Sequence, residues 1–119
     1  MINQKNISKE DLEAIINTFP LTPMFNKVVI TLNTEEVDNF LILSDNTMSD
    51  QQFIIARGSH VNNLTLGDKV LLDLEKMMVY EVNQEDAYEK ISRIKVDPIL
   101  VDGVTYGIIE DRLIKARYN

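Results

Sequence analysis

The stretch LTLGDKVLLDL, residues 64–74, decides the fold class because it sets a turn directly before an apolar strand. Gly67 and Asp68 are the turn signal, and we expect Gly67 to adopt a backbone conformation that other residues disfavour. Apolar residues alternate on both sides of this turn, with the period of a half-buried strand. The residues expected on the buried side are Leu64, Leu66, Val70 and Leu72. Nothing in the stretch indicates catalysis.

Similar apolar runs recur along the rest of the chain and are separated by polar turns. Asp102-Gly103 lies between two of them and supplies the two positive-φ positions of a type I′ hairpin turn. Many short strands with regular turns are typical of a β-barrel or sandwich. The predicted strands are 26–33, 39–44, 52–58, 67–74, 77–83, 98–101, 104–110 and 112–118. Residues 83–94 read either as a helix capped by Asn83 or as an acidic loop followed by a strand.

A short helix is predicted before the first strand. Ser8 is a suitable N-cap, Asp11 occupies the third helical position, and Pro20 ends the helix. Four apolar residues recur at helical spacing and form one stripe. They are Leu12, Ile15, Ile16 and Phe19. The stripe docks either on the chain's own β-domain or on a neighbouring protein.

Composition indicates one globular domain. The chain has 119 residues, of which 45% are hydrophobic, so one core is expected. Its 12 basic and 19 acidic residues give a net charge of −7, which argues against nucleic acid and anionic membranes as partners. The absence of cysteine excludes disulfides and thiolate metal sites and fits a virion or the host cytoplasm. The sequence shows no membrane span and no secretory signal.

Residue types that catalysis, metal binding or phosphate binding requires are scarce in the sequence. His60 is the only histidine, so a catalytic triad or a histidine metal site has no partners for it. Asp45, Asn46 and Asp50 suggest a calcium loop only faintly, since the central glycine and the closing glutamate are missing. The four glycines are too scattered to cradle a phosphate. We therefore predict no enzymatic activity, no cofactor and no metal.

Three blocks of sequence, in the correct order, resemble the co-chaperonin family, the GroES-like ten-kilodalton chaperonins. LTLGDKVLL resembles that family's Val-Gly-Asp-x-Val motif, residues 21–32 are similar to its opening strand, and residues 99–118 are similar to its closing hairpin and strand. QFIIARG matches a strand of the family that ends near a glycine. The resemblance implies a mainly β protein, a small GroES-like β-barrel at residues 21–119. It is preceded by a helical arm at residues 1–20 and carries an insertion near residues 75–95.

The sequence departs from the family where the family grips its chaperonin. Co-chaperonins carry a long loop between their first two strands, and that loop ends in an apolar tripeptide. Here the connection reads as only NTEEVDN before the strand that contains FLIL, and the roof hairpin is reduced to SHVNN. The interpretation placed first is therefore a non-catalytic structural protein, an auxiliary or decoration capsid protein of a bacteriophage. The alternative is a functional co-chaperonin, also phage-encoded, that assists the folding of a capsid protein.

Both interpretations make this a protein that binds proteins, as a homo-oligomer or as part of a larger assembly that includes a major capsid protein or a chaperonin. In the family the opening and final strands meet between subunits, so the resemblance implies contact edges at residues 27–32 and 112–118. The helix stripe is predicted to add an apolar anchor. The predicted partner-binding residues are Leu12, Ile15, Ile16, Phe19, Arg112, Ile114 and Lys115.

Overall fold

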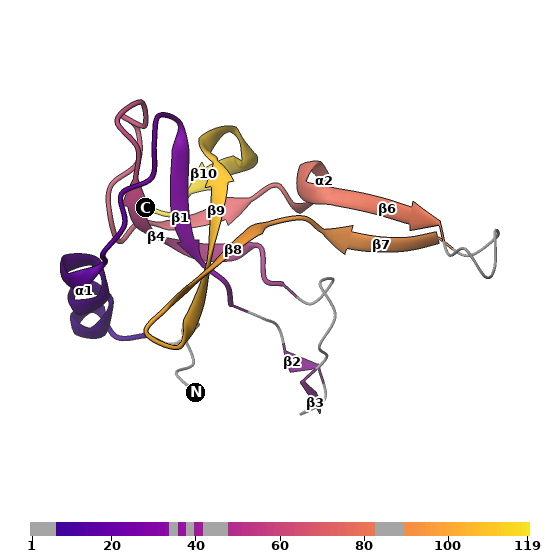
Figure 1. Cartoon of the computed structure of the whole chain (residues 1–119), viewed down its shortest axis with the longest axis horizontal. Helices are drawn as coiled ribbons and strands as arrows, with labels where there is room; N and C mark the ends of the chain where they lie inside the picture. The colour runs from indigo at the N-terminus through magenta and orange to yellow at the C-terminus, as the bar shows by residue number, and fades with distance from the viewer. Residues whose placement is uncertain (1–6, 34–35, 38–39, 42–47, 83–89) are drawn as a thin grey trace.

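The computed structural model describes residues 7–33, 36–37, 40–41, 48–82 and 90–119. A six-stranded antiparallel sheet forms the body of the molecule, in the order β10-β5-β4-β1-β9-β8, with one helix packed on it (Figure 1). The elements are α1 (Lys9–Thr18), β1 (Lys27–Thr31), β2 (Glu36–Val37), β3 (Phe40–Leu41), β4 (Gln51–Arg57), β5 (Lys69–Leu72), α2 (Leu74–Met77), β6 (Met78–Val82), β7 (Lys90–Ile94), β8 (Asp97–Val101), β9 (Val104–Glu110), the 3₁₀ helix η3 (Asp111–Leu113) and β10 (Ile114–Arg117).

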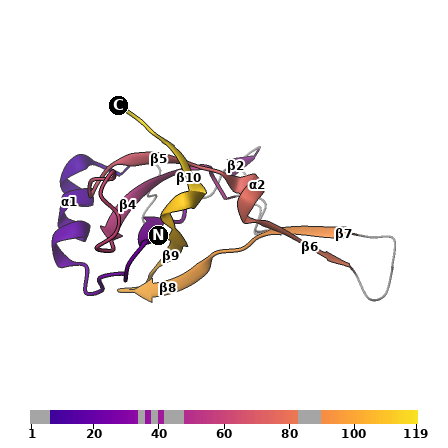
Figure 2. The ribbon, with the colours of Figure 1, turned by 90° about the horizontal axis from the view of Figure 1, so that it is seen from above.

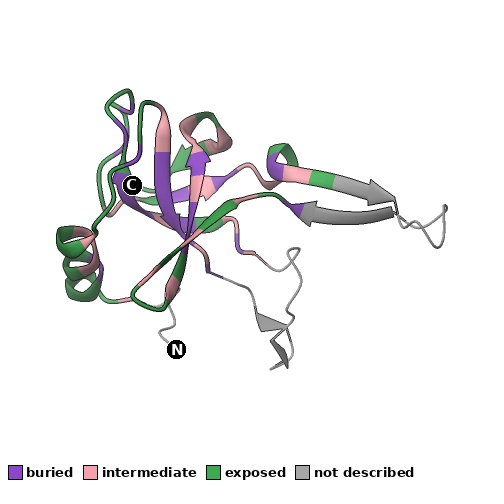
Figure 3. Cartoon of the chain, in the orientation of Figure 1, coloured by how far each residue is buried: buried purple, intermediate pink, exposed green. Residues whose placement is uncertain are grey.

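Strand β1 is the centre of the sheet and is buried on both of its faces (Figure 3). Val28 and Ile30 join the larger apolar cluster, while Val29 between them joins the second cluster, beneath α1. The pairing with β4 contains a β-bulge, because Val29 stands opposite Ala56 but Ile30 stands opposite Ile54. The extra residue, Ile55, therefore lies on the helix side together with Ala56.

Helix α1 covers one face of the sheet, as its sequence pattern predicts. Ser8 caps it, since its hydroxyl accepts a hydrogen bond from the Asp11 N–H at 3.1 Å. Leu12 is buried against the second cluster, and the Phe19 ring meets Tyr106 edge-on with their centroids 5.2 Å apart. Of the two docking sites left open by the sequence, the structure shows the helix on the chain's own sheet.

The prediction of a mainly β fold is confirmed, but the sheet does not close into a barrel. The terminal strands β8 and β10 lie at opposite ends of the sheet order and are not paired with each other, so the sheet is open. The sheet separates two apolar clusters, one of which lies beneath α1. The expectation that residues 27–32 form an open edge is wrong, because β1 pairs with both β4 and β9.

The strand and turn signals in the second half of the chain are largely confirmed. Asp102 and Gly103 have φ values of 51° and 78° and join β8 to β9, as the type I′ signal predicts. Gly67 has a φ of 89°, and Leu64, Val70 and Leu72 are buried. Leu66 is 41% exposed and so contradicts its predicted burial, because the chain turns before β5 and no longer follows the strand period.

A two-stranded ribbon, β6–β7, extends away from the sheet (Figures 1 and 2). Residues 90–94 form the second strand of this ribbon. Of the two alternatives for residues 83–94, a strand is therefore correct for residues 90–94, while residues 83–89 lie outside the described residues. The base of the ribbon packs on the larger cluster through Met78 and Ile94, next to Met77 of α2.

Candidate functional site: protein-interaction surfaces

The connection between β1 and β4 is longer than the sequence suggests. The sequence predicts a second strand at residues 39–44. Phe40–Leu41 form a strand there, which pairs with β2 in a separate two-stranded unit, and the other residues of the segment lie outside the described ones. Among the described strands, the one that follows β1 in the main sheet is β4, and we call the connection between them, residues 32–50, the excursion (Figure 1). In sequence it contains the four consecutive apolar residues Phe40–Leu43.

The two ends of this excursion are held together by Gln52, which is completely buried. Its side-chain oxygen accepts hydrogen bonds from the Thr31 hydroxyl and the Asn33 N–H, both at 2.8 Å. Its amide nitrogen donates to the carbonyl oxygens of Asn33 at 3.0 Å and Ser49 at 2.8 Å. The Ser49 N–H also donates to the Asn33 carbonyl at 2.9 Å. The amide oxygen and nitrogen thus use all of their hydrogen-bonding positions. Asn33 and Ser49, near the two ends of the excursion, are held side by side.

The sequence-predicted partner residues fall on two different parts of the fold. The helix residues Leu12, Ile15, Ile16 and Phe19 pack on the second cluster, while Ile114 packs at the edge of the larger cluster. Arg112 in η3 and Lys115 in β10 are exposed. The structure therefore does not join the two predicted groups into one surface. Their role in binding a partner stays a prediction, and the helix stripe is already occupied by the chain's own sheet.

Both outer strands of the sheet carry features that limit edge pairing. In β8, the backbone groups of Pro98 and Leu100 face the open side by antiparallel alternation, and Pro98 has no N–H. In β10, the register shifts between Ile114 and Ala116, and the exposed positions include Lys115 and Arg117. Proline, bulges and cations are the usual protection of edges against unspecific pairing. A strand of a partner that pairs with β10 must therefore supply negative charges for Lys115 and Arg117 as well as backbone hydrogen bonds.

A small ion cluster lies where β9 passes into η3. Glu110 accepts a hydrogen bond from the Arg112 guanidinium and a second from the Lys27 ammonium at 3.4 Å. The Arg112 bond first, and then the Lys27 bond, lower the pKa of the Glu110 carboxyl below its ordinary value. The Asp111 N–H donates to the Asn26 carbonyl at 2.9 Å, which brings η3 beside the turn before β1.

That turn exposes two apolar side chains that the sequence reading missed. Met24 is 63% exposed and Phe25 is 57% exposed, and Phe25 has a φ of 55°, a conformation that bulky residues rarely adopt. The segment between Pro20 and β1 has no clear pattern in sequence, and no local signal marks it. Gln52 was missed as well, since a glutamine within an apolar strand reads as a surface position.

Among the described residues, no group of three or more His, Asp or Glu side chains is placed to hold a metal ion. No helix in the described part of the chain has the length and apolar character of a membrane span. No protein-family model matches the chain, and none of the curated proteins matches it. The fold is mainly β, and the co-chaperonin resemblance stays a prediction.

Proposed function

We propose that this chain is a non-catalytic protein-binding module of the co-chaperonin type, which assists the folding of a capsid protein together with a chaperonin. The observation that carries the proposal is the excursion over residues 32–50, which is anchored at both ends by Gln52. The sequence alone suggested that this connection was too short to reach a chaperonin. Among the described strands, the main sheet continues from β1 to β4, and this supports a connection long enough to reach a partner.

The excursion has the composition that such a contact requires. Its sequence combines acidic residues, Glu35, Glu36 and Asp38, with the apolar run Phe40–Leu43. Burial of a few large apolar side chains in a partner supplies most of the free energy of a small protein–protein contact. An anchored base reduces the conformational entropy that the segment loses on binding. An apolar run of this kind fits a hydrophobic groove on a large partner.

The direct test uses the purified full chain, a double-ring chaperonin and adenine nucleotide. We expect the chain to co-sediment with the chaperonin only when nucleotide is present, and to sediment by itself as a closed ring. The double variant Phe40→Ser/Leu41→Ser should lose chaperonin binding. Leu100→Ser, which changes a 72% exposed leucine on β8, is the matched control and should bind normally. Equal binding by both variants would refute the proposed contact.

A structural role in a phage particle is the second candidate, and the β6–β7 ribbon favours it. A two-stranded ribbon is marginally stable alone in water, and this one forms a sheet separate from the main sheet, with its base packed on the core. A neighbouring subunit in a capsid would cover it. In this role the protein is located in the virion, whereas the co-chaperonin acts in the host cytoplasm. Stoichiometric recovery of the chain with mature particles, together with failure to bind a chaperonin, would establish the structural role.

A further inference from the structure

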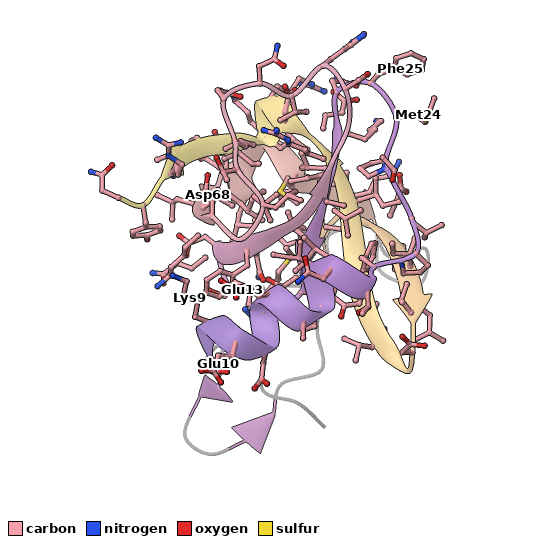
Figure 4. All side chains as sticks on the ribbon, turned by 90° about the vertical axis from the view of Figure 1, so that its left-hand side faces the viewer. Lys9, Glu10, Glu13, Met24, Phe25 and Asp68 are labelled. Atoms are coloured by element: carbon pink, nitrogen blue, oxygen red, sulfur yellow. The ribbon has the colours of Figure 1, made fainter. Side chains whose placement is uncertain are left out.

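The turn before β1 forms a rigid apolar tip, made of Met24, Phe25 and the neighbouring His60. Figure 4 shows Met24 and Phe25 projecting from the end of the molecule opposite the acidic residues of α1. The Phe25 and His60 rings lie against each other, with centroids 5.3 Å apart. Both Met24 and Phe25 are more than half exposed, so the chain's own core does not account for them.

The backbone of this tip is held in a strained conformation. Phe25 has a φ of 55°, and its carbonyl oxygen accepts the His60 N–H at 2.9 Å. The Lys27 N–H donates to the Met24 carbonyl at 3.0 Å and closes the turn. A large aromatic residue in the left-handed region is unfavourable, and asparagine or glycine would fold there more easily. Strain of this kind, with the side chain left in solvent, points to a role in recognition.

The charges beside the tip are nearly balanced. Lys27 and Arg112 hold Glu110 between them, and Asp111 lies next to Asn26 of the turn. Arg57, opposite Val28 and next to Gly58, adds a third cation, so the segments around the tip carry three positive and two negative side chains on a chain whose net charge is −7. The tip is thus a place where two copies can approach each other with little local repulsion.

The apolar residues are also concentrated here. Leu21, Met24 and Phe25 fall within one short segment, while the other large exposed apolar residues in the described part of the chain come singly from separate elements. A head-to-tail contact needs a second, different patch of similar strength, and a two-fold contact needs only one. We propose that the tip binds the same tip of a second copy, in an isologous contact centred on Phe25. The proposal does not depend on the proposed function.

The test is the mass of the full chain in sedimentation experiments over a wide concentration range. Association through the tip should double the sedimenting mass. If the chain is a monomer the product is a dimer, and if the chain forms a ring the product is a pair of rings. The contact is small, so we expect weak and reversible association. Raising the salt concentration should strengthen it, because salt screens the repulsion between two negatively charged chains.

Phe25→Asn is the decisive variant, because asparagine tolerates the left-handed backbone. It should weaken the mass-doubling association by about tenfold or more while thermal stability stays equal or rises. Met24→Ser should weaken association in the same direction, and Leu100→Ser should associate like the natural chain. Three results would each overturn the proposal: no mass doubling at any concentration or salt, an unchanged association in Phe25→Asn, or an association that salt weakens.

Discussion

The carbonyl oxygen of Phe25 lies 2.2 Å from the position that a β-carbon would take on Gly58. No residue with a side chain fits there unless one of the two backbones moves. The close approach is stabilised by hydrogen bonds from the Gly58 N–H to the Lys27 carbonyl at 2.8 Å and from the His60 N–H to Phe25. Gly58 thus ends β4 and also determines where the turn with Met24 and Phe25 lies.

Gly58→Ala should therefore lower the free energy of unfolding by about 3 kcal/mol, the upper part of the usual range for overpacking. Gly67→Ala is the matched control. Its β-carbon would be 3.5 Å from the nearest atom, of Ile16, so only the positive φ opposes it, at a cost of about 1–2 kcal/mol. Urea unfolding of both variants measures the difference. If Gly67→Ala proved the more harmful change, the close approach at Gly58 would not be the limiting constraint.

Gln52→Leu tests the anchor of the excursion between β1 and β4. Leucine is of similar size, but the Thr31 O–H, the Asn33 N–H and the Ser49 carbonyl lose their hydrogen bonds to the glutamine side chain. Unsatisfied buried groups cost about 1–3 kcal/mol each before relaxation, so we expect a loss of about 2–4 kcal/mol. Gln51→Leu, at the exposed neighbouring position, should change stability by less than about 0.5 kcal/mol.

Hydrogen exchange gives the local readout of the same prediction. The Asn33 N–H, which donates to the Gln52 side chain, should lose protection in Gln52→Leu more than the N–H groups of β9 do. Uniform loss across the sheet would mean that the glutamine supports the core in general and has no special role at the ends of the excursion.

Local signals in the sequence were sufficient for most elements of the fold. The cap at Ser8, the turn at Asp102-Gly103 and the positive φ of Gly67 each depend on a few neighbouring residues, and all three were predicted. The open sheet was not predicted. It depends on which strands pair, with β8 and β10 left at opposite ends of the order, and these are contacts between segments distant in sequence.

The candidate surfaces were predicted less well for the same reason. Leu12 and its neighbours were recognised as an apolar stripe, but a stripe does not indicate which surface it meets. The apolar run at residues 40–43 has the composition of a strand, and Phe40–Leu41 form one, but its pairing with β2 and the pairing of β1 with β4 have no signal in the sequence. Phe25 lies in a segment without periodicity, so only the three-dimensional structure reveals its exposure.

Glu110→Gln should change how stability depends on pH. The pKa of this carboxyl is lower in the folded chain than in the unfolded chain, because Arg112 and Lys27 stabilise its charged form. Its contribution is therefore complete above the unfolded value, about 4.3, and is lost as the pH falls through the folded value. Below about pH 5 the natural chain should lose stability with a steeper slope than the variant. Parallel pH profiles would show that the ion cluster does not stabilise the fold.

Leu12→Ala measures how much the helix contributes to the chain's own core. Leu12 is 6% exposed and packs with Val29, Ile55 and Tyr106 in the second cluster. Truncation of a buried leucine costs about 2–5 kcal/mol, and the site beside a single helix can relax, so we expect the lower half of that range. Glu13→Ala, on the exposed side of the same helix, is the control. If Leu12→Ala left the stability unchanged, the helix stripe would not stabilise the chain's own core, and the prediction that it anchors a neighbouring protein would be favoured.

Lys115→Glu tests the predicted partner role of β10. Lys115 is exposed on an outer strand of the sheet, so reversal of its charge should leave the free energy of unfolding within about 0.5 kcal/mol of the natural value. If a neighbouring copy or a partner adds to this edge, the same change should weaken assembly, since the edge would present the wrong charge to the incoming strand.

Lys95→Glu, at an exposed lysine between β7 and β8, is the matched control. Ring formation by sedimentation and chaperonin binding are the two readouts. Selective loss in Lys115→Glu would support β10 as a contact edge, and equal behaviour of the two variants would place the contact elsewhere on the molecule.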